Sequence, residues 1–211
     1  MASLSDESRR RSFGQDHDLT PVDRLGIWLS SRRIRRTGGT LVGKRVADIG
    51  CGYHAQLARS FVGDVSRLLL LDVALDPGLR SNPKVTAIEG HLPEALEDVP
   101  ERSQDVVICN SVLEHVWDAE ACLRGLRRIL APSGTLLLNV PSWRGKSFLE
   151  FSAFRLRTSP AEEMDDHKMY YDPRDLWPSL VRAGFRPRGI RCFRHKFGLN
   201  TFAVCHEQDD V

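Results

Sequence analysis

The sequence has few of the features that identify several large classes of protein. No run approaches the roughly 20 consecutive apolar residues of a membrane-spanning helix. The five cysteines are odd in number and form no CxxC pair, which argues against a disulfide framework and against a zinc knuckle. The opening residues, MASLSDESRRRSFGQD, contain no apolar core, so we expect no signal peptide and a cytoplasmic protein. A formal net charge of +2 gives no reason to expect nucleic acid as a partner.

The chain has 211 residues, which suits one compact domain. Residues 1–19 are polar, rich in serine and arginine and without periodicity, so we expect a flexible segment there. Residues 20–211 are expected to form a single domain. Within it, residues 142–171 break the regular pattern, and we interpret them as an insertion that covers the ends of the strands.

A helix is expected at the start of this domain. Thr20 is a typical N-cap, Pro21 suits the first helical position, and Asp23 falls in the positive first turn. An apolar stripe at helical spacing is expected to face the core, and it consists of Leu25, Trp28 and Leu29.

Short apolar runs then alternate with helical patterns. The runs read as buried strands at residues 45–49, 68–71, 85–88, 106–109 and 136–140. Helical patterns lie at residues 56–61, 93–98, 118–130 and 173–183. Two last apolar segments, near residues 190–193 and 202–205, are close enough to form an antiparallel pair. This alternation predicts an α/β fold with a doubly wound sheet.

The stretch with the most chemical content is a glycine turn after the first strand. Gly50 and Gly52 permit a tight turn and a close approach of a ligand to the backbone. Asp72 follows Gly52 by 20 residues, the position from which a carboxylate binds the ribose of a nucleoside. Asp48, two residues before the turn, would repel a pyrophosphate but would accept a cationic amino-acid ligand. The turn therefore favours S-adenosylmethionine over a nicotinamide dinucleotide.

Five motifs in order carry a resemblance to a family: VADIGCGYH, LLLLDVAL, IEGHLPE, DVVICNSVLEHV and LRRILAPSGTLLLNVPS. Over about residues 40–205 they resemble the class I S-adenosylmethionine-dependent methyltransferases (type 11-like). The resemblance implies a Rossmann-like seven-stranded sheet of order 3-2-1-4-5-7-6 with the seventh strand antiparallel. It also implies that the cofactor is bound by a set of residues comprising Asp48, Gly50, Gly52, Asp72, Val73, His91, Leu92 and Asn110.

The residues after the fourth strand bear on the methyl acceptor. The N-P-P-[YF] element of enzymes that methylate base nitrogens is absent, and Cys109 lacks the preceding proline of a pyrimidine-attacking cysteine. Glu114-His115 is similar to the E-x-x-E-H element of ubiquinone-biosynthesis O-methyltransferases and small-RNA ribose methyltransferases, which in those families binds a metal. Here Ser111 replaces the first glutamate. In many relatives that use no metal, L-E-H-V simply lines the pocket.

His167, in the insertion, could meet Glu114 and His115 over the acceptor site. These three residues are the predicted catalytic group. They could hold Mg²⁺ or another divalent cation, or His167 could act as a general base. Either role favours an oxygen acceptor.

Several acceptors stay open. Aromatic side chains available for stacking (Trp143, Tyr170, Tyr171 and Trp177) suit a sugar or oligosaccharide hydroxyl, and the downstream segment resembles glycan-associated O-methyltransferases. The alternatives are RNA, a protein or a small phenolic metabolite. The basic cluster at Arg32, Arg33, Arg35 and Arg36 could track phosphates, although such clusters are usually solvated. A non-catalytic scaffold and a homodimer are also open.

Overall fold

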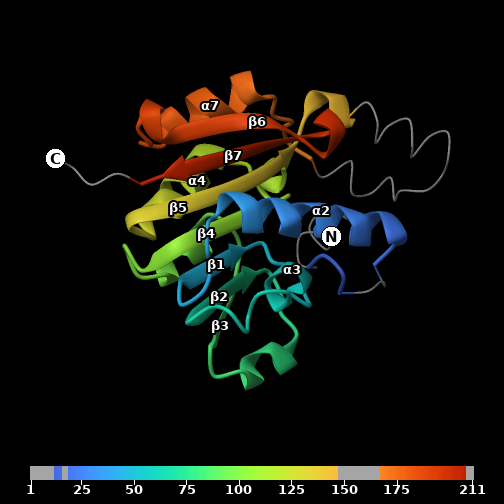
Figure 1. Cartoon of the computed structure of the whole chain (residues 1–211), viewed down its shortest axis with the longest axis vertical. Helices are drawn as coiled ribbons and strands as arrows, with labels where there is room; N and C mark the ends of the chain where they lie inside the picture. Colours follow the sequence, from blue (N-terminus) through green and yellow to red (C-terminus); the bar gives the residue numbers. More distant parts are fainter. Residues whose placement is uncertain (1–11, 16–18, 147–166, 208–211) are drawn as a thin grey trace, which may run out of the picture.

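The computed structural model describes residues 12–15, 19–146 and 167–207 of the chain. Seven strands form one sheet of order β3-β2-β1-β4-β5-β7-β6, as expected (Figure 1). Their bounds are β1 Arg45–Ile49, β2 Arg67–Asp72, β3 Val85–Glu89, β4 Gln104–Asn110, β5 Leu130–Pro141, β6 Ile190–His195 and β7 Asn200–His206. The first five strands are parallel, and β7 runs antiparallel to both of its neighbours.

Helices cover both faces of this sheet (Figure 1). The α-helices are α2 Pro21–Thr37, α3 Gln56–Arg59, α4 Ala119–Arg128 and α7 Pro173–Arg182. Short 3₁₀ turns are η1 Pro77–Ser81, η2 Glu94–Asp98, η3 Leu113–His115, η5 Pro187–Gly189 and η6 Lys196–Gly198. On one face α4 and α7 bury Leu123 and Leu176, and on the other α2 and α3 bury Ile34 and Leu57. Central strands such as β2 are apolar on both sides because both sides are covered.

The first helix begins as expected, but two of the three residues of its expected apolar stripe are exposed, and the third, Leu29, is half-buried. The Thr20 hydroxyl accepts the backbone N–H of Asp23, whose carboxylate accepts the N–H of Thr20, forming a capping box. Leu25 and Trp28 are 55% and 53% exposed. The fully buried positions, Ser30 and Ile34, lie in the second half of α2, which is the half that packs against the domain.

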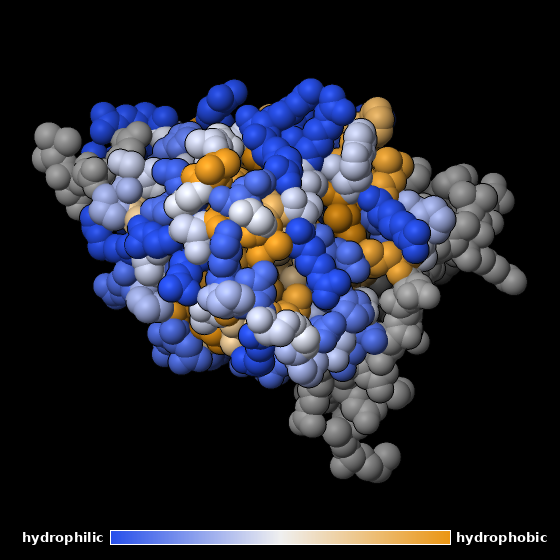
Figure 2. Space-filling view, turned by 60° about the horizontal axis from the view of Figure 1, so that its bottom comes forward, coloured by the Kyte–Doolittle hydropathy of each residue, from blue (hydrophilic) through white to orange (hydrophobic). Residues whose placement is uncertain are grey.

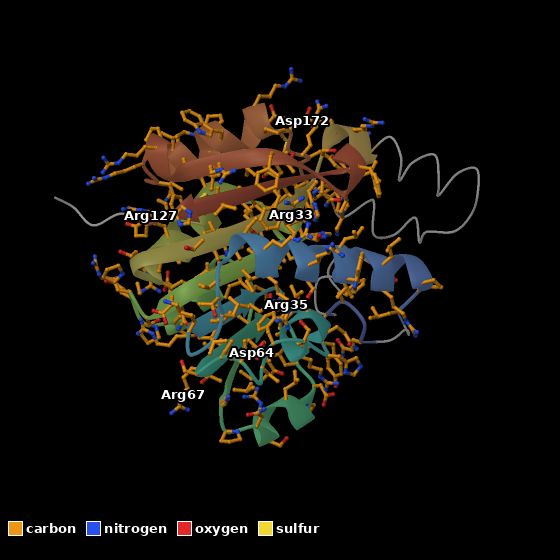
Figure 3. All side chains as sticks on the ribbon, viewed as in Figure 1. Arg33, Arg35, Asp64, Arg67, Arg127 and Asp172 are labelled. Atoms are coloured by element: carbon orange, nitrogen blue, oxygen red, sulfur yellow. The ribbon has the colours of Figure 1, made fainter. Side chains whose placement is uncertain are left out.

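The exposed side chains of α2 make contacts of their own. The Arg32 guanidinium lies over the Trp28 ring, 5.5 Å from its centroid. Arg35 points down from α2 to Asp64, with 3.3 Å between Nη1 and Oδ2 (Figure 3). Figure 2 shows that apolar residues on the face drawn there are interrupted by hydrophilic ones. In the part of the chain that is described, no helix is long and apolar enough to cross a membrane.

Three other elements differ from their predicted bounds or type. The predicted helix at 93–98 is a 3₁₀ turn, and the helix at 56–61 already ends at Arg59. The helix predicted at 118–130 ends at Arg128, because β5 begins at Leu130 and takes in the segment with Pro132 and Gly134. A register shift between Gln104 and Val106 accommodates this early start of β5.

The direction of β7 determines what lies at the carboxyl edge of the sheet. Because β7 pairs antiparallel with β5, Asn200 at its start lies opposite Pro141 at the end of β5. The turn between β6 and β7 is therefore at the same edge as the ends of β1, β2 and β4. Ser142 holds it there: its hydroxyl donates to the carbonyl of Gly198 (2.7 Å) and its N–H to that of Leu199 (3.0 Å).

Candidate active site

The glycine turn lies where β1 ends. Gly50 and Gly52 have φ angles of 70° and 75°, in the left-handed region that favours glycine. A Cβ on Gly50 would also collide with the side chain of Val112, which follows the neighbouring strand β4. The N–H of Gly50 donates to the carbonyl of Leu71, which ties the turn to β2. Backbone conformation and packing thus both require glycine at position 50.

Two carboxyl groups flank this turn. Asp48 is 1% exposed, its Oδ2 has no hydrogen-bond partner, and burial raises its pKa to about 7, with Asp72 adding to the rise. Asp72 accepts hydrogen bonds from the N–H groups of Gly52 (2.7 Å) and Val73 (2.8 Å). Burial also raises the pKa of Asp72, and these hydrogen bonds offset part of that rise. The pair has the electrostatics of a site for a cation.

A short N-terminal piece lies against the same turn. The carbonyl of Phe13 accepts the N–H of Tyr53 at 2.9 Å, and Ser12 is buried beside Asp72. The flexibility predicted for residues 1–19 concerns a segment of which only 12–15 and 19 are described.

The other predicted cofactor residues lie at the same edge of the sheet. His91 is exposed, and its carbonyl accepts the N–H of Ala95, while Leu92 packs against the core. At the end of β4, Asn110 accepts a hydrogen bond from Asn139 of β5 through its side-chain oxygen (3.1 Å). His91 and Leu92 follow the end of β3, and Asn110 is the last residue of β4, so these positions lie at the same edge of the sheet as the glycine turn.

The predicted catalytic residues come together. One candidate ligand atom from each of Glu114, His115 and His167 can be chosen such that all lie within 4.8 Å of one another. The two imidazole rings are 4.8 Å apart, centroid to centroid, in an edge-on arrangement. The backbone N–H of Lys168 donates to the carbonyl of Glu114 (2.6 Å), which joins the end of the predicted insertion to η3. We call these three residues the Glu114 cluster.

Glu114 is the fully buried member of this cluster. Its side chain is 1% exposed and Oε2 has no hydrogen-bond partner. Burial raises its pKa to about 8, and the charge of Lys196 opposes the rise. His167 is oriented by Tyr170, whose hydroxyl lies 2.9 Å from Nδ1. The Tyr170 ring in turn lies 5.6 Å from that of Trp143.

Lys196 was missed by the sequence analysis. It lies in the turn between β6 and β7, and it is partly buried. Burial lowers the pKa of its ammonium to about 8, against the opposing effect of Glu114. The expected antiparallel direction of the seventh strand could have indicated Lys196, because this direction places the turn between β6 and β7 at the ligand edge of the sheet.

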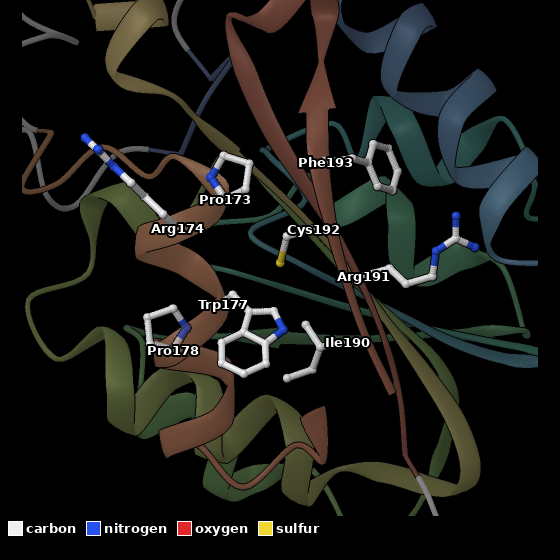
Figure 4. A pocket seen from close by; sticks show the side chains of 8 residues that line it. All are labelled: Pro173, Arg174, Trp177, Pro178, Ile190, Arg191, Cys192 and Phe193. Atoms are coloured by element: carbon white, nitrogen blue, oxygen red, sulfur yellow. The ribbon is translucent and has the colours of Figure 1, made fainter. Parts of the chain in front are cut away.

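Two of the expected stacking residues are elsewhere. Tyr171 is buried in the core, and its N–H donates to the carbonyl of Pro141. Trp177 borders a groove of about 610 Å³ between α7 and β6, and no residue of the Glu114 cluster lines it (Figure 4). Cys109 is fully buried and its pKa is raised well above the usual value, in agreement with a core role.

Comparisons with known proteins agree on one family. A profile described as a methyltransferase domain matches residues 28–188. The ubiquinone biosynthesis O-methyltransferase of Escherichia coli is 27% identical over 199 residues, covering 89% of this chain and 78% of the relative. The enzyme of the same name from Aliivibrio fischeri is 28% identical over 173 residues, covering 78% and 73%.

Solved structures share the fold at lower identity. A methyltransferase in complex with the Trm112 activator of Haloferax volcanii superposes with a TM-score of 0.67 at 13% identity, covering 88% of this chain and 92% of that one. The methyltransferase CalH in complex with SAH gives 0.62 at 19%, covering 88% and 59%. These relatives are not specifically glycan-associated enzymes, so they support the methyltransferase family and not that finer part of the expected resemblance. With the glycine turn and its flanking carboxylates, these matches place the chain in the methyltransferase-domain family, and it is an S-adenosylmethionine-dependent methyltransferase.

Proposed function

We propose that the chain is an O-methyltransferase that transfers the methyl group to a hydroxyl of a small molecule at the Glu114 cluster. The observation that carries this proposal is the convergence of Glu114, His115 and His167 within 4.8 Å at the ligand edge of the sheet. The O-methyltransferase relatives support an oxygen acceptor.

The donor end is built from the glycine turn and its two carboxylates. S-adenosylmethionine supplies an electrophilic methyl group on a positively charged sulfur. The unpartnered Oδ2 of Asp48 fits a ligand that brings its own cationic groups. Asp72 would exchange its backbone partners, in part, for the ribose hydroxyls. The glycines leave the backbone open to the ligand.

The acceptor end must hold a hydroxyl in line with the methyl group and remove its proton. His167 suits the second task, because it is an imidazole at the Glu114 cluster whose Nδ1 lies 2.9 Å from the Tyr170 hydroxyl, which orients the ring. Glu114 and His115 position the oxygen. As the new oxygen–carbon bond forms and the sulfur–carbon bond breaks, the hydroxyl proton passes to His167.

A divalent cation fits the same three residues. The unpartnered, buried Oε2 of Glu114 and two imidazoles form a donor set of one oxygen and two nitrogens. Such a set suits zinc, iron or manganese better than magnesium, which prefers oxygen ligands. A bound cation would lower the pKa of the acceptor hydroxyl. The protein's own residues would keep their positioning roles.

A sugar or oligosaccharide hydroxyl is the acceptor class that we propose first. Trp143 is 42% exposed and stands next to Tyr170, and a pair of aromatic rings of this kind suits the apolar face of a sugar ring. A small phenolic metabolite is the second candidate, because it would stack on the same face and carries a more acidic hydroxyl. RNA and protein have less support, since Arg32 and Arg35 already make contacts within the chain.

An acceptor screen with methyl-labelled cofactor tests the function. Mono- and oligosaccharides, small phenols and RNA would be compared. Sedimentation would show separately whether the chain forms a homodimer. We expect labelled product from a hydroxyl compound and none after His167→Ala, which should still bind cofactor. His206→Ala is the matched control, because His206 is an exposed histidine at the end of β7, far from the carboxyl edge of the sheet. Product from nitrogen or carbon acceptors alone would refute the proposal.

The cation is tested separately. A chelator should abolish turnover, and zinc or manganese should restore it and raise the melting temperature of the wild type more than that of Glu114→Gln. Turnover undiminished by the chelator would exclude the metal and leave His167 as the base.

A further inference from the structure

The turn between β6 and β7 has an unusual backbone. Three consecutive residues, Lys196, Phe197 and Gly198, have φ angles of 47°, 59° and 85°. Only the last is a glycine, and a non-glycine residue in this region costs on the order of 1 kcal/mol. Ser142 anchors the turn through two hydrogen bonds. Conformations of this kind persist where surrounding contacts impose them, and they often lie at ligand sites.

This backbone directs the Lys196 ammonium into the space between three elements. A Cβ built on Gly26 of α2 would lie 3.6 Å from Nζ, so the ammonium lies against the backbone of that helix. Glu114 of η3 is the acidic group that acts on it electrostatically. The turn itself forms the third side. Lys196 therefore lies at the same edge of the sheet as the glycine turn, and it reaches the acceptor end of the site from the side of β7.

The ammonium is short of partners in this position. Within residues 12–15, 19–146 and 167–207, Nζ makes no hydrogen bond or ion pair, although it can donate three hydrogen bonds. Its chain neighbour His195 is neutral near pH 7, because burial first, and then Lys196 and Arg33, lower its pKa to about 4. A partly buried ammonium that has no hydrogen-bond acceptor among the described residues can bind an acidic group of a ligand.

We infer that Lys196 binds a carboxylate of the acceptor, so that the favoured substrate is a hydroxyl compound that also bears an acid group. A carboxylate would supply the hydrogen-bond acceptors that Nζ lacks. A single negative charge is the better match than a phosphate dianion, because the carboxyl group of Glu114 already lies near Lys196. This inference rests on the proposed transfer to oxygen at the Glu114 cluster.

Pairs of probes that differ only in the acid group test the inference. The pairs are glucuronate against glucose and protocatechuate against catechol. Binding is measured by calorimetry on protein loaded with S-adenosylhomocysteine, which needs no turnover, and KM is measured with S-adenosylmethionine. We expect the wild type to favour the acidic member of at least one pair. Lys196→Met should weaken the binding of that acidic probe by about tenfold or more. It should leave the affinity for the neutral probe of the pair within about twofold of the wild type.

Two further variants separate this role from a structural one. Lys196→Arg keeps the charge and should retain most of the preference. Arg194→Gln removes an exposed positive charge from the same hairpin and should change neither member of a pair. If Lys196 only neutralised Glu114, Lys196→Met would weaken both members equally, and the inference would be wrong.

The remaining outcomes are also decisive. A wild type that binds neither acidic probe, or that shows no preference for one, overturns the inference. Acid-selective binding that depends on Lys196, without methylation of any hydroxyl probe, would refute the O-methyltransferase proposal and leave the carboxylate site standing.

Discussion

Replacing Asp48 by asparagine should make the cofactor-free protein more stable and a worse binder of cofactor. Asp48 is fully buried, one of its oxygens has no partner, and its pKa is raised from 3.8 to about 7. A raised carboxyl pKa means that ionisation opposes folding. The penalty is absent below the unfolded-state pKa and grows until the pH passes the folded-state pKa.

The magnitude follows from the size of the shift. About three pKa units at 1.36 kcal/mol each give a penalty of about 4 kcal/mol above pH 7, as an upper limit. At about pH 5.5 the folded protein still holds the proton, and the same arithmetic gives about 2 kcal/mol. Asp48→Asn removes the ionisable group. Its stabilising effect should therefore be about 2 kcal/mol larger at about pH 8 than at about pH 5.5.

Urea unfolding of both proteins across this pH range measures the difference, without ligand and then with S-adenosylmethionine. Asp105→Asn is the control of opposite sign, because three hydrogen bonds from Arg45, two from its guanidinium and one from its backbone N–H, lower the pKa of Asp105. That variant should lose stability at neutral pH, and the loss should shrink as the pH falls. Without cofactor, an Asp48→Asn protein no more stable than the wild type at about pH 8 would contradict the reasoning.

Three further changes have simple expectations. Gly50→Ala should destabilise the fold by about 2 kcal/mol or more, through its positive φ and its collision with Val112, and adding Val112→Ala should recover part of the loss in urea unfolding. Trp28→Gln should change the free energy of unfolding by less than about 0.5 kcal/mol, because Trp28 is exposed on α2. Tyr170→Phe, which removes the hydroxyl beside His167, should lower kcat and leave cofactor affinity unchanged in calorimetry; an unaltered kcat would remove Tyr170 from the orientation of His167.

The sheet was predictable because its signals are local and repeated. Buried parallel strands read as short apolar runs, and the strand order followed from the motif resemblance. The apolar stripe of α2 failed for a physical reason. Spacing identifies a helix face, but it does not tell how much of the helix reaches the core, and here only the half that contains Ser30 and Ile34 does so.

The residues of the site also divide into those that the sequence indicated and one that it did not. Glu114 and His115 are adjacent in a strand-end motif, so the sequence pointed to them directly. His167 was predicted from the usual position of the insertion, and the geometry brings it to the other two. Lys196 escaped notice because nothing in the residues around it marks a site. Its place depends on the antiparallel direction of β7 and on the hydrogen bonds from Ser142.

The turn that carries Lys196 can change in evolution independently of the strands at the centre of the sheet. The donor site depends on β1, β2 and β4, whose residues pack into the centre of the sheet and tolerate little substitution. The β6–β7 turn is a short surface connection at the rim, fastened by backbone groups rather than by its own side chains. Lys196 and Phe197 can change while the strands and Gly198, whose φ of 85° favours glycine, are kept. New acceptors can thus be acquired while the methyl donor stays the same, and grafting this turn between relatives is a practical route to altered specificity.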